Sequence, residues 1–257
     1  MDTIALSLPS GALTLNLTDT GRGTGYLLLH GGMGPGSMAP LAGALGREGR
    51  VLTPVHPGFD GTPRPGGFTR PEDLADAYLK LLETLDLEKV VVVGNSFGGW
   101  VAAEMALRNS SRIAGMALLN PVAIDTGSPD RKIVDPTQVP PADRPRLSFH
   151  NPALATPPGP DQLARMAANQ EALRVYAGPG LHDPHLRLRL AGIRIPTVIV
   201  WGLSDRIVDE DYGRLWAASI PGARFEPLAE AGHFPQIEQT QRVATLVREL
   251  SPGGGPR

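Results

Sequence analysis

Residues 90–100 of the chain read Val-Val-Val-Val-Gly-Asn-Ser-Phe-Gly-Gly-Trp. Four consecutive valines are typical of a strand that is buried on both faces, because β-branched side chains suit a covered sheet. The strand is expected to end at Gly94, and an apolar segment with helical spacing begins directly after Ser96. The small residues Gly94 and Gly98 allow a sharp turn that pushes the serine outward, which is the G-x-S-x-G pattern of a nucleophile elbow. An ordinary glycine-rich turn would show the same five residues, so the rest of the chain has to decide.

The composition is that of a globular protein. Its 257 residues suit one large α/β domain with room for an insertion. The net charge of −2 gives no electrostatic reason to expect nucleic acid or an anionic membrane as a partner. There are no cysteines, which excludes disulfides and thiolate chemistry. We find no signal peptide and no apolar run of the roughly 18 residues that cross a bilayer, and we therefore expect a cytoplasmic protein. The oligomeric state cannot be inferred from these features.

Strands and helices are expected to alternate along most of the chain. The expected strands cover residues 3–8, 12–18, 26–29, 50–55, 90–93, 113–119, 197–201 and 223–228. The expected helices cover residues 38–46, 71–85, 97–109, 161–176, 209–219 and 236–250. This alternation predicts a mostly parallel central sheet with helices on both faces. Ligands of such sheets bind beyond the carboxyl ends of the strands.

The expected alternation of strands and helices stops between residues 122 and 190. Prolines are frequent there, no strand-like run is found, and one amphipathic helix is predicted at 161–176. Because this segment carries its own helix and interrupts the sheet, we interpret residues 122–190 as a lid inserted into a core of residues 1–121 and 191–250. The glycine- and proline-rich end, residues 251–257, is predicted to be unstructured.

A catalytic base and acid are needed if Ser96 is a nucleophile, because a serine hydroxyl reacts poorly at neutral pH. Of the six histidines, only His233 lies in a loop after a late strand with a glycine directly before it. Asp205 follows the strand at 197–201 and precedes His233. The order Ser96, Asp205, His233 is the one known for the α/β-hydrolase fold and for no other triad fold.

The chain as a whole resembles the α/β-hydrolase superfamily. The similar motifs are His30-Gly31-Gly32, Gly94-Asn95-Ser96-Phe97-Gly98-Gly99, Trp201-Gly202-Leu203-Ser204-Asp205 and Gly232-His233. They lie within residues 25–120 and 195–250, so only the insertion is left out. The resemblance implies that Ser96 attacks the substrate, that His233 takes and returns the proton, and that Asp205 fixes the imidazole tautomer.

The resemblance also implies an oxyanion hole made of the backbone N–H groups of Phe97 and Gly32, with Met33 as the fallback for the second donor. His30 is expected to hold the loop's own backbone and not to touch substrate. In many relatives an aspartate stands where this chain has His56. The role of His56 therefore stays open.

Three other aspartates are alternatives to Asp205 as the catalytic acid. Asp209 and Asp211 are better suited to begin the next helix. Some relatives carry the acid after the strand that follows the elbow helix, where this chain has Asp125. Asp125 opens the insertion, and we expect it to be solvated and Asp205 to be the acid.

An apolar pocket beside an activated serine predicts a carboxylesterase for small to medium apolar acids. The predicted substrate-binding residues are Met33, Met166 and Phe234, with Phe97, Leu163 and Tyr176 as further lining residues. No cofactor and no metal site is implied. The two histidines of His182-Asp183-Pro184-His185 are interpreted as part of a turn.

The elbow also resembles that of meta-cleavage product hydrolases, which cut carbon–carbon bonds. Those relatives have a tryptophan soon after the catalytic histidine and an arginine in the lid. Here Phe234 follows the histidine, and Arg165 and Arg174 lie on the predicted helix of the insertion. Carbon–carbon hydrolysis is therefore the second hypothesis. Epoxide hydrolase and dehalogenase chemistry need a carboxylate nucleophile, whereas perhydrolysis, acyl transfer and ligand binding without catalysis stay open.

Overall fold

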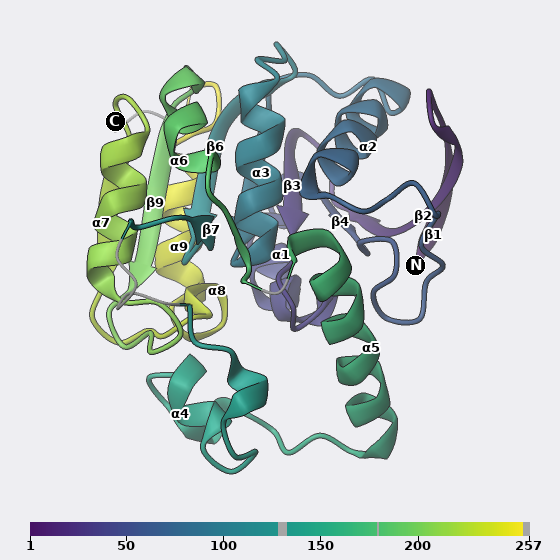
Figure 1. Ribbon diagram of the computed structural model, residues 1–257. Helices are drawn as coiled ribbons and strands as arrows, with labels where there is room; N and C mark the ends of the chain where they lie inside the picture. Colours follow the sequence, from purple (N-terminus) through teal and green to yellow (C-terminus); the bar gives the residue numbers. More distant parts are fainter. Residues whose placement is uncertain (128–132, 179, 254–257) are drawn as a thin grey trace.

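The computed structural model describes residues 1–127, 133–178 and 180–253 (Figure 1). Part of the predicted lid, residues 128–132 and Pro179, lies outside this range. So do residues 254–257 of the tail that was predicted to be unstructured. In the described part of that tail, the hydroxyl of Ser251 lies 3.1 Å from that of Tyr26. None of the described helices combines the length and apolar character that a bilayer crossing requires.

An eight-stranded sheet forms the centre of the molecule, in the order β1-β2-β4-β3-β5-β6-β9-β10. Its strands are β1 (Asp2–Leu8), β2 (Gly11–Thr20), β3 (Thr24–Leu29), β4 (Gly49–Pro54), β5 (Val90–Asn95), β6 (Ile113–Leu119), β9 (Thr197–Gly202) and β10 (Arg224–Leu228). The β1–β2 and β2–β4 pairs are antiparallel, and the other pairs are parallel. The prediction of a mostly parallel central sheet is confirmed.

The four valines occupy β5 in the middle of this sheet. Val90 and Val92 pack into the hydrophobic cluster on one face, whereas Val91 and Val93 pack into the cluster on the other face. Successive side chains of a strand point to opposite faces. An unbroken apolar run is therefore what a strand between two helical layers requires.

Helices cover both faces of the sheet (Figure 1). The helices α2 (Pro71–Thr84), α3 (Phe97–Leu107) and α7 (Glu210–Ser219) contribute to one hydrophobic cluster. The helices α1 (Ala39–Leu45), preceded by η1 (Pro35–Met38), and α9 (Thr240–Arg248) contribute to the cluster on the opposite face. This completes the three-layer architecture that the alternating pattern predicted.

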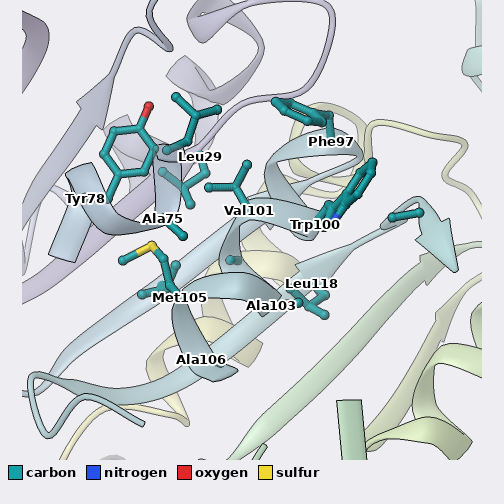
Figure 2. Packing of buried hydrophobic residues seen from close by; sticks show 14 of the residues in the cluster. Leu29, Ala75, Tyr78, Phe97, Trp100, Val101, Ala103, Met105, Ala106 and Leu118 are labelled. Atoms are coloured by element: carbon teal, nitrogen blue, oxygen red, sulfur yellow. The ribbon is translucent and has the colours of Figure 1, made fainter. Parts of the chain in front are cut away.

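The helix α3 lies in the interior, and its residues 97–106 are all buried. Figure 2 shows Val101 and Met105 of this helix beside Tyr78 and Ala75 of α2. A helix that packs on the sheet with one side and on another helix with the other is expected to be apolar on both sides, and Glu104 is the one charged residue of α3. The element that follows Ser96 is thus rigidly embedded.

The described residues of the insertion between β6 and β9 form eight elements, of which only α5, with 18 residues, is long. They are β7 (Ala123–Ile124), η2 (Pro136–Gln138), α4 (Arg144–Ser148), η3 (Pro152–Leu154), α5 (Pro160–Ala177), β8 (His182–Asp183), α6 (Leu186–Arg189) and η4 (Leu190–Gly192). The helix predicted at 161–176 is present as α5. The expectation of one helix and no strand was wrong. Pro145 stands in the first turn of the additional helix α4, where proline is tolerated, so the frequent prolines did not exclude a helix. The paired strands β7 and β8 are too short to show a periodicity.

The predicted helix at 236–250 is divided into α8 (Pro235–Glu238) and α9. The backbone of Gln239, with φ −127° and ψ 43°, leaves the helical region between them. The carboxylate of Glu238 accepts hydrogen bonds from the backbone N–H groups of Gly232, His150 and Asn151. The short helix α8 thereby joins the loop of His233 to the insertion.

Candidate active site

Ser96 occupies the turn between β5 and α3. Its backbone has φ 53° and ψ −120°, which a residue other than glycine rarely adopts. A Cβ atom added to Gly94 would lie 2.2 Å from the carbonyl oxygen of Gly98, and one added to Gly98 would lie 2.1 Å from the carbonyl oxygen of Leu29. The two glycines are therefore required by the close approach of backbone, and the turn has the geometry of an elbow.

The start of α3 and the loop after β3 both adjoin this turn. The first N–H groups of a helix have no acceptor within it, and Phe97 is the first residue of α3. On the other side, a Cβ atom added to Gly31 would lie 2.9 Å from Cβ of Ser96. The loop after β3, which contains Gly32, therefore lies against the elbow, and the oxyanion hole of Phe97 and Gly32 stays a prediction.

Asp205 and His233 form a buried pair. Oδ2 of Asp205 lies 2.7 Å from Nδ1 of His233. Oδ1 of Asp205 accepts hydrogen bonds from the N–H groups of Ile207 (2.7 Å) and Val208 (3.2 Å). Because a carboxylate oxygen can only accept here, Nδ1 of His233 carries a proton, and in the neutral imidazole Nε2 then has the free lone pair. His233 is thus held in the tautomer that can take a proton from a serine.

Asn120, at the end of β6, is a site residue that sequence reasoning missed. Its Nδ2 donates to Oδ2 of Asp205 at 2.7 Å, and its Oδ1 accepts from the N–H of Gly202 at 3.0 Å. The carboxylate of Asp205 therefore receives four hydrogen bonds and cannot rotate freely. The only signal in the sequence is an asparagine directly after a buried strand, at the edge of the sheet where ligands bind.

Asn95 connects the elbow to the loop of His233. Its Nδ2 donates to the carbonyl oxygen of His233 at 2.9 Å and to that of Leu119 at 3.0 Å. The residue before Ser96 is thus bonded to His233, which in turn is bonded to Asp205. The structure therefore joins the turn of Ser96 to the loop of His233 through Asn95, and the loop of His233 to Asp205.

The alternative acids have other partners. The exposed Asp125 accepts the N–H of Gly127 at 2.7 Å in a local turn. Asp209 precedes α7 and accepts the N–H of Tyr212 at 2.8 Å, as an N-terminal capping residue does. Asp211 lies in the first turn of the same helix.

His56, whose role was open, belongs to a buried network that holds the loop after β3. Its Nε2 donates to the carbonyl oxygen of His30 (2.9 Å), and its backbone N–H donates to Nε2 of His30 (3.1 Å). Nδ1 of His30 consequently carries a proton, which it donates to the carbonyl oxygen of Gly31 (2.8 Å). The hydroxyl of Tyr78 donates to Nδ1 of His56. The two histidines therefore fix the backbone on either side of Gly31.

Both histidines are neutral in this network. Burial lowers the pKa of His30 to about 4 and holds the pKa of His56 well below its usual value of 6.5. A histidine whose pKa is lower in the folded than in the unfolded protein makes its full contribution to stability above pH 6.5. This contribution is lost as the pH falls from 6.5 toward 4, because the unfolded chain then binds protons that the folded protein does not.

We expect the urea midpoint to fall steeply between pH 6.5 and about 4, and to fall less steeply in His56→Gln, which removes one of the two groups. The measurement is urea unfolding at half-unit pH steps. His182→Gln is the matched control, because His182 is exposed and its replacement should leave the slope unchanged. If the urea midpoint fell equally steeply with pH in His56→Gln and in the wild type, the lowered pKa of His56 would be contradicted.

The predicted substrate-binding residues differ in exposure. Met33 and Met166 are 40% and 37% exposed, whereas Phe234 is buried. The ring of Phe234 lies 5.2 Å from the ring of Phe149 and 5.2 Å from that of His233. Phe234 thus supports the catalytic loop from the side of the insertion, and a direct contact with substrate stays a prediction.

The first part of the insertion is bonded directly to the loops of the site. The carbonyl oxygen of Ser148 accepts the N–H of His233 at 2.7 Å, and that of Leu147 accepts the N–H of Arg206 at 3.0 Å. A Cβ atom added to Gly232 would lie 2.4 Å from the carbonyl oxygen of Ser148. The insertion is therefore part of the scaffold that places His233.

A group of carboxylates lies elsewhere in the molecule. Oxygens of Glu72, Glu104 and Asp183 lie within 4.8 Å of one another. The guanidinium of Arg189 lies 2.6 Å from Oε1 of Glu104 and 2.6 Å from Oδ2 of Asp183, and Arg108 lies 3.3 Å from Glu104. These arginines meet the negative charges of Glu104 and Asp183, so the group is understood as an ion-pair network that joins α3 to the end of the insertion.

Comparisons with known proteins agree with this geometry. The model of a family described as "Alpha/beta hydrolase family" matches residues 26–246. A 2-hydroxy-6-oxononadienedioate/2-hydroxy-6-oxononatrienedioate hydrolase of Paraburkholderia xenovorans is 26% identical, and the aligned region covers 92% of this chain and 90% of that relative. A 2-hydroxy-6-oxo-2,4-heptadienoate hydrolase of Pseudomonas putida is 27% identical, with 94% of each chain covered.

Two solved structures have similar folds and sequences. A thermophilic esterase from Thermogutta terrifontis has a TM-score of 0.78 and 26% identity, with 97% of each chain covered. A meta-cleavage product hydrolase from Pseudomonas fluorescens has a TM-score of 0.75 and 26% identity, with 96% of each chain covered. The chain is thus similar to hydrolases of two kinds.

Proposed function

The chain belongs to the α/β-hydrolase family, and from this membership we propose that it is a serine hydrolase that cleaves carboxylic esters of small to medium apolar acids. The observation that carries the proposal is the buried hydrogen bond between Asp205 and His233, joined through Asn95 to the elbow of Ser96. An activated serine with a fixed base is suited to acyl transfer. The fold alone would not decide this, because it supports many reactions.

In the proposed reaction, Oγ of Ser96 attacks the ester carbonyl carbon while its proton passes to Nε2 of His233. The electron pair of the carbonyl moves onto its oxygen, which the N–H groups of Phe97 and Gly32 stabilise. The tetrahedral intermediate then expels the alcohol, which takes the proton from His233, and the acyl group stays on Ser96. Water repeats the same steps and releases the acid.

Carbon–carbon bond hydrolysis is the second candidate, because several curated relatives are named as hydrolases of oxo-dienoates and related dioates. Two features support ester cleavage instead. The residue after His233 is Phe234, where meta-cleavage product hydrolases carry a tryptophan shortly after the histidine. In the insertion, Arg165 and Arg174 are both exposed on α5, as arginines of any surface helix are, and Arg174 lies 3.8 Å from Glu171 on the same helix.

Labelling with a fluorophosphonate probe tests the proposal. We expect wild type to be labelled and Ser96→Ala to be unlabelled, because only a serine activated by a neighbouring base reacts with this electrophile. Ser204→Ala is the matched control, since Ser204 lies next to Asp205 and is bonded to His150. This variant should be labelled like the wild type. An unlabelled wild-type protein would favour ligand binding without catalysis.

The substrate class is then decided by kinetics. We expect kcat/KM on p-nitrophenyl esters of short and medium acids to exceed that on a 2-hydroxy-6-oxo-dienoate, with both activities absent in Ser96→Ala. A Ser96-dependent activity that is higher on the dienoate would replace ester cleavage by carbon–carbon hydrolysis.

A further inference from the structure

The C-terminal half of α5 lies directly over Gly32, which carries one of the two predicted oxyanion donors. A Cβ atom added to Gly32 would lie 3.2 Å from Cδ2 of Leu173 and 3.6 Å from Nε2 of Gln170. The amide of Gln170 therefore lies at the edge of the proposed oxyanion hole. In Figure 1, α5 extends from this point away from the sheet.

Two neighbouring side chains of α5 carry the same functional group and use it differently. Asn169 is buried, and both of its side-chain amide atoms are bonded to Asp60. Oδ1 of Asn169 accepts the backbone N–H of Asp60 at 2.7 Å, and Nδ2 of Asn169 donates to Oδ1 of Asp60 at 2.9 Å. This pair holds α5 on the core. Gln170 is half-buried, and its side-chain amide has no hydrogen-bond partner among the residues that the structure describes. Its amide is therefore available to a ligand.

The face of α5 that carries Gln170 continues outward with apolar residues. Leu163, Met166, Gln170 and Leu173 are separated by three, four and three positions, which places them on one side of the helix. Leu163 and Met166 are 51% and 37% exposed. Along this face, a ligand bound at Ser96 would meet Leu173 and the amide of Gln170 beside Gly32, and the apolar side chains of Met166 and Leu163 further out.

We propose that Gln170 is a specificity-determining residue, whose amide N–H binds a hydrogen-bond acceptor on the acyl part of the substrate, close to the scissile carbonyl. This inference rests on the proposed ester hydrolysis and narrows it. The favoured substrates are esters whose acyl group carries an ether, carbonyl or hydroxyl oxygen next to the ester group and an apolar portion beyond. Because the amide is neutral, such uncharged acceptors suit it without the desolvation that a carboxylate would require.

A pair of esters with equal numbers of heavy atoms tests this proposal. p-Nitrophenyl methoxyacetate and p-nitrophenyl butanoate differ in one atom, an ether oxygen in place of a methylene group. Their intrinsic reactivities differ, but this difference cancels when the ratio of their kcat/KM values is compared between protein variants. We expect Gln170→Leu to lower the methoxyacetate-to-butanoate ratio about 3- to 10-fold, the effect of one neutral hydrogen bond. Gln170→Glu should lower it further, because a carboxylate repels the ether oxygen.

Gln241→Leu is the matched control, because Gln241 is exposed on α9, and it should leave the ratio unchanged. A merely structural role of Gln170 would alter the rates of both esters equally and leave their ratio constant, which would overturn the inference. Fluorophosphonate labelling of Ser96 separates the two proposals. If the wild type is labelled and cleaves esters while the ratio stays constant, only the role of Gln170 fails. If the wild type is neither labelled nor active, the proposed function fails.

Discussion

Replacing Asp205 with asparagine is expected to lower kcat for ester hydrolysis by about 10⁴-fold, the loss that the same change causes in other serine triads. Oδ1 of Asp205 accepts two backbone N–H groups, from Ile207 and Val208, so the oxygen of the new amide has to stay there. The amide nitrogen then faces His233 and donates to its Nδ1. The proton of the imidazole moves to Nε2, and the ring can no longer take the proton of Ser96.

The same substitution also places two donors against each other. Nδ2 of Asn120 donates to Oδ2 of Asp205 in the wild type, and in Asp205→Asn it meets a second amide nitrogen. Asn120 cannot turn over without losing the bond of its Oδ1 to the N–H of Gly202. We therefore expect a small loss of stability in addition to the large loss of rate.

Asp209→Asn is the matched control, because Asp209 lies in the same loop and only caps α7, a role that asparagine fills equally well. Its activity should equal that of the wild type. Asp125→Asn tests the other position at which relatives carry the acid. A large loss of kcat in Asp125→Asn, with little effect of Asp205→Asn, would transfer the catalytic role to Asp125.

Gly98→Ala is expected to lower the free energy of unfolding by about 3 kcal/mol or more. The new methyl group would lie 2.1 Å from the carbonyl oxygen of Leu29 and 2.6 Å from that of His30. Both neighbours are backbone, at the end of a central strand, and α3 is packed on all sides. Neither element can move without opening the elbow, so we also expect activity to be lost in any folded fraction.

Gly43→Ala is the control for this substitution. Gly43 lies within α1, and a Cβ atom added there has no neighbour within 4 Å. An alanine in a helix should stabilise the protein by about 0.5–1 kcal/mol relative to glycine. The free energies of unfolding of the two variants and the wild type are compared by urea unfolding. A Gly98→Ala protein as stable as the wild type would show that the turn is less crowded than the structure indicates.

Much of the fold was predictable because its signals are local. The valines of β5 alternate between two hydrophobic clusters. A strand buried in this way needs an apolar run, which is directly visible in the sequence. The insertion was predicted less well. Its elements β7 and β8 have two residues each, too few for a periodic pattern, and they exist because their chain segments are brought together from positions 123 and 182.

The sequence by itself determined the chain order of Ser96, Asp205 and His233, and the glycines that make the elbow possible. These are properties of single loops, and they depend on residue type and spacing. Only the tertiary structure decided how the loops are joined. Asn120 holds Asp205 across 85 positions, His56 holds His30 across 26, and Gln170 of α5 lies over Gly32. A hydrogen bond between distant residues leaves no periodic or local pattern, because its geometry is fixed by the packing of the whole chain and not by its neighbours in sequence.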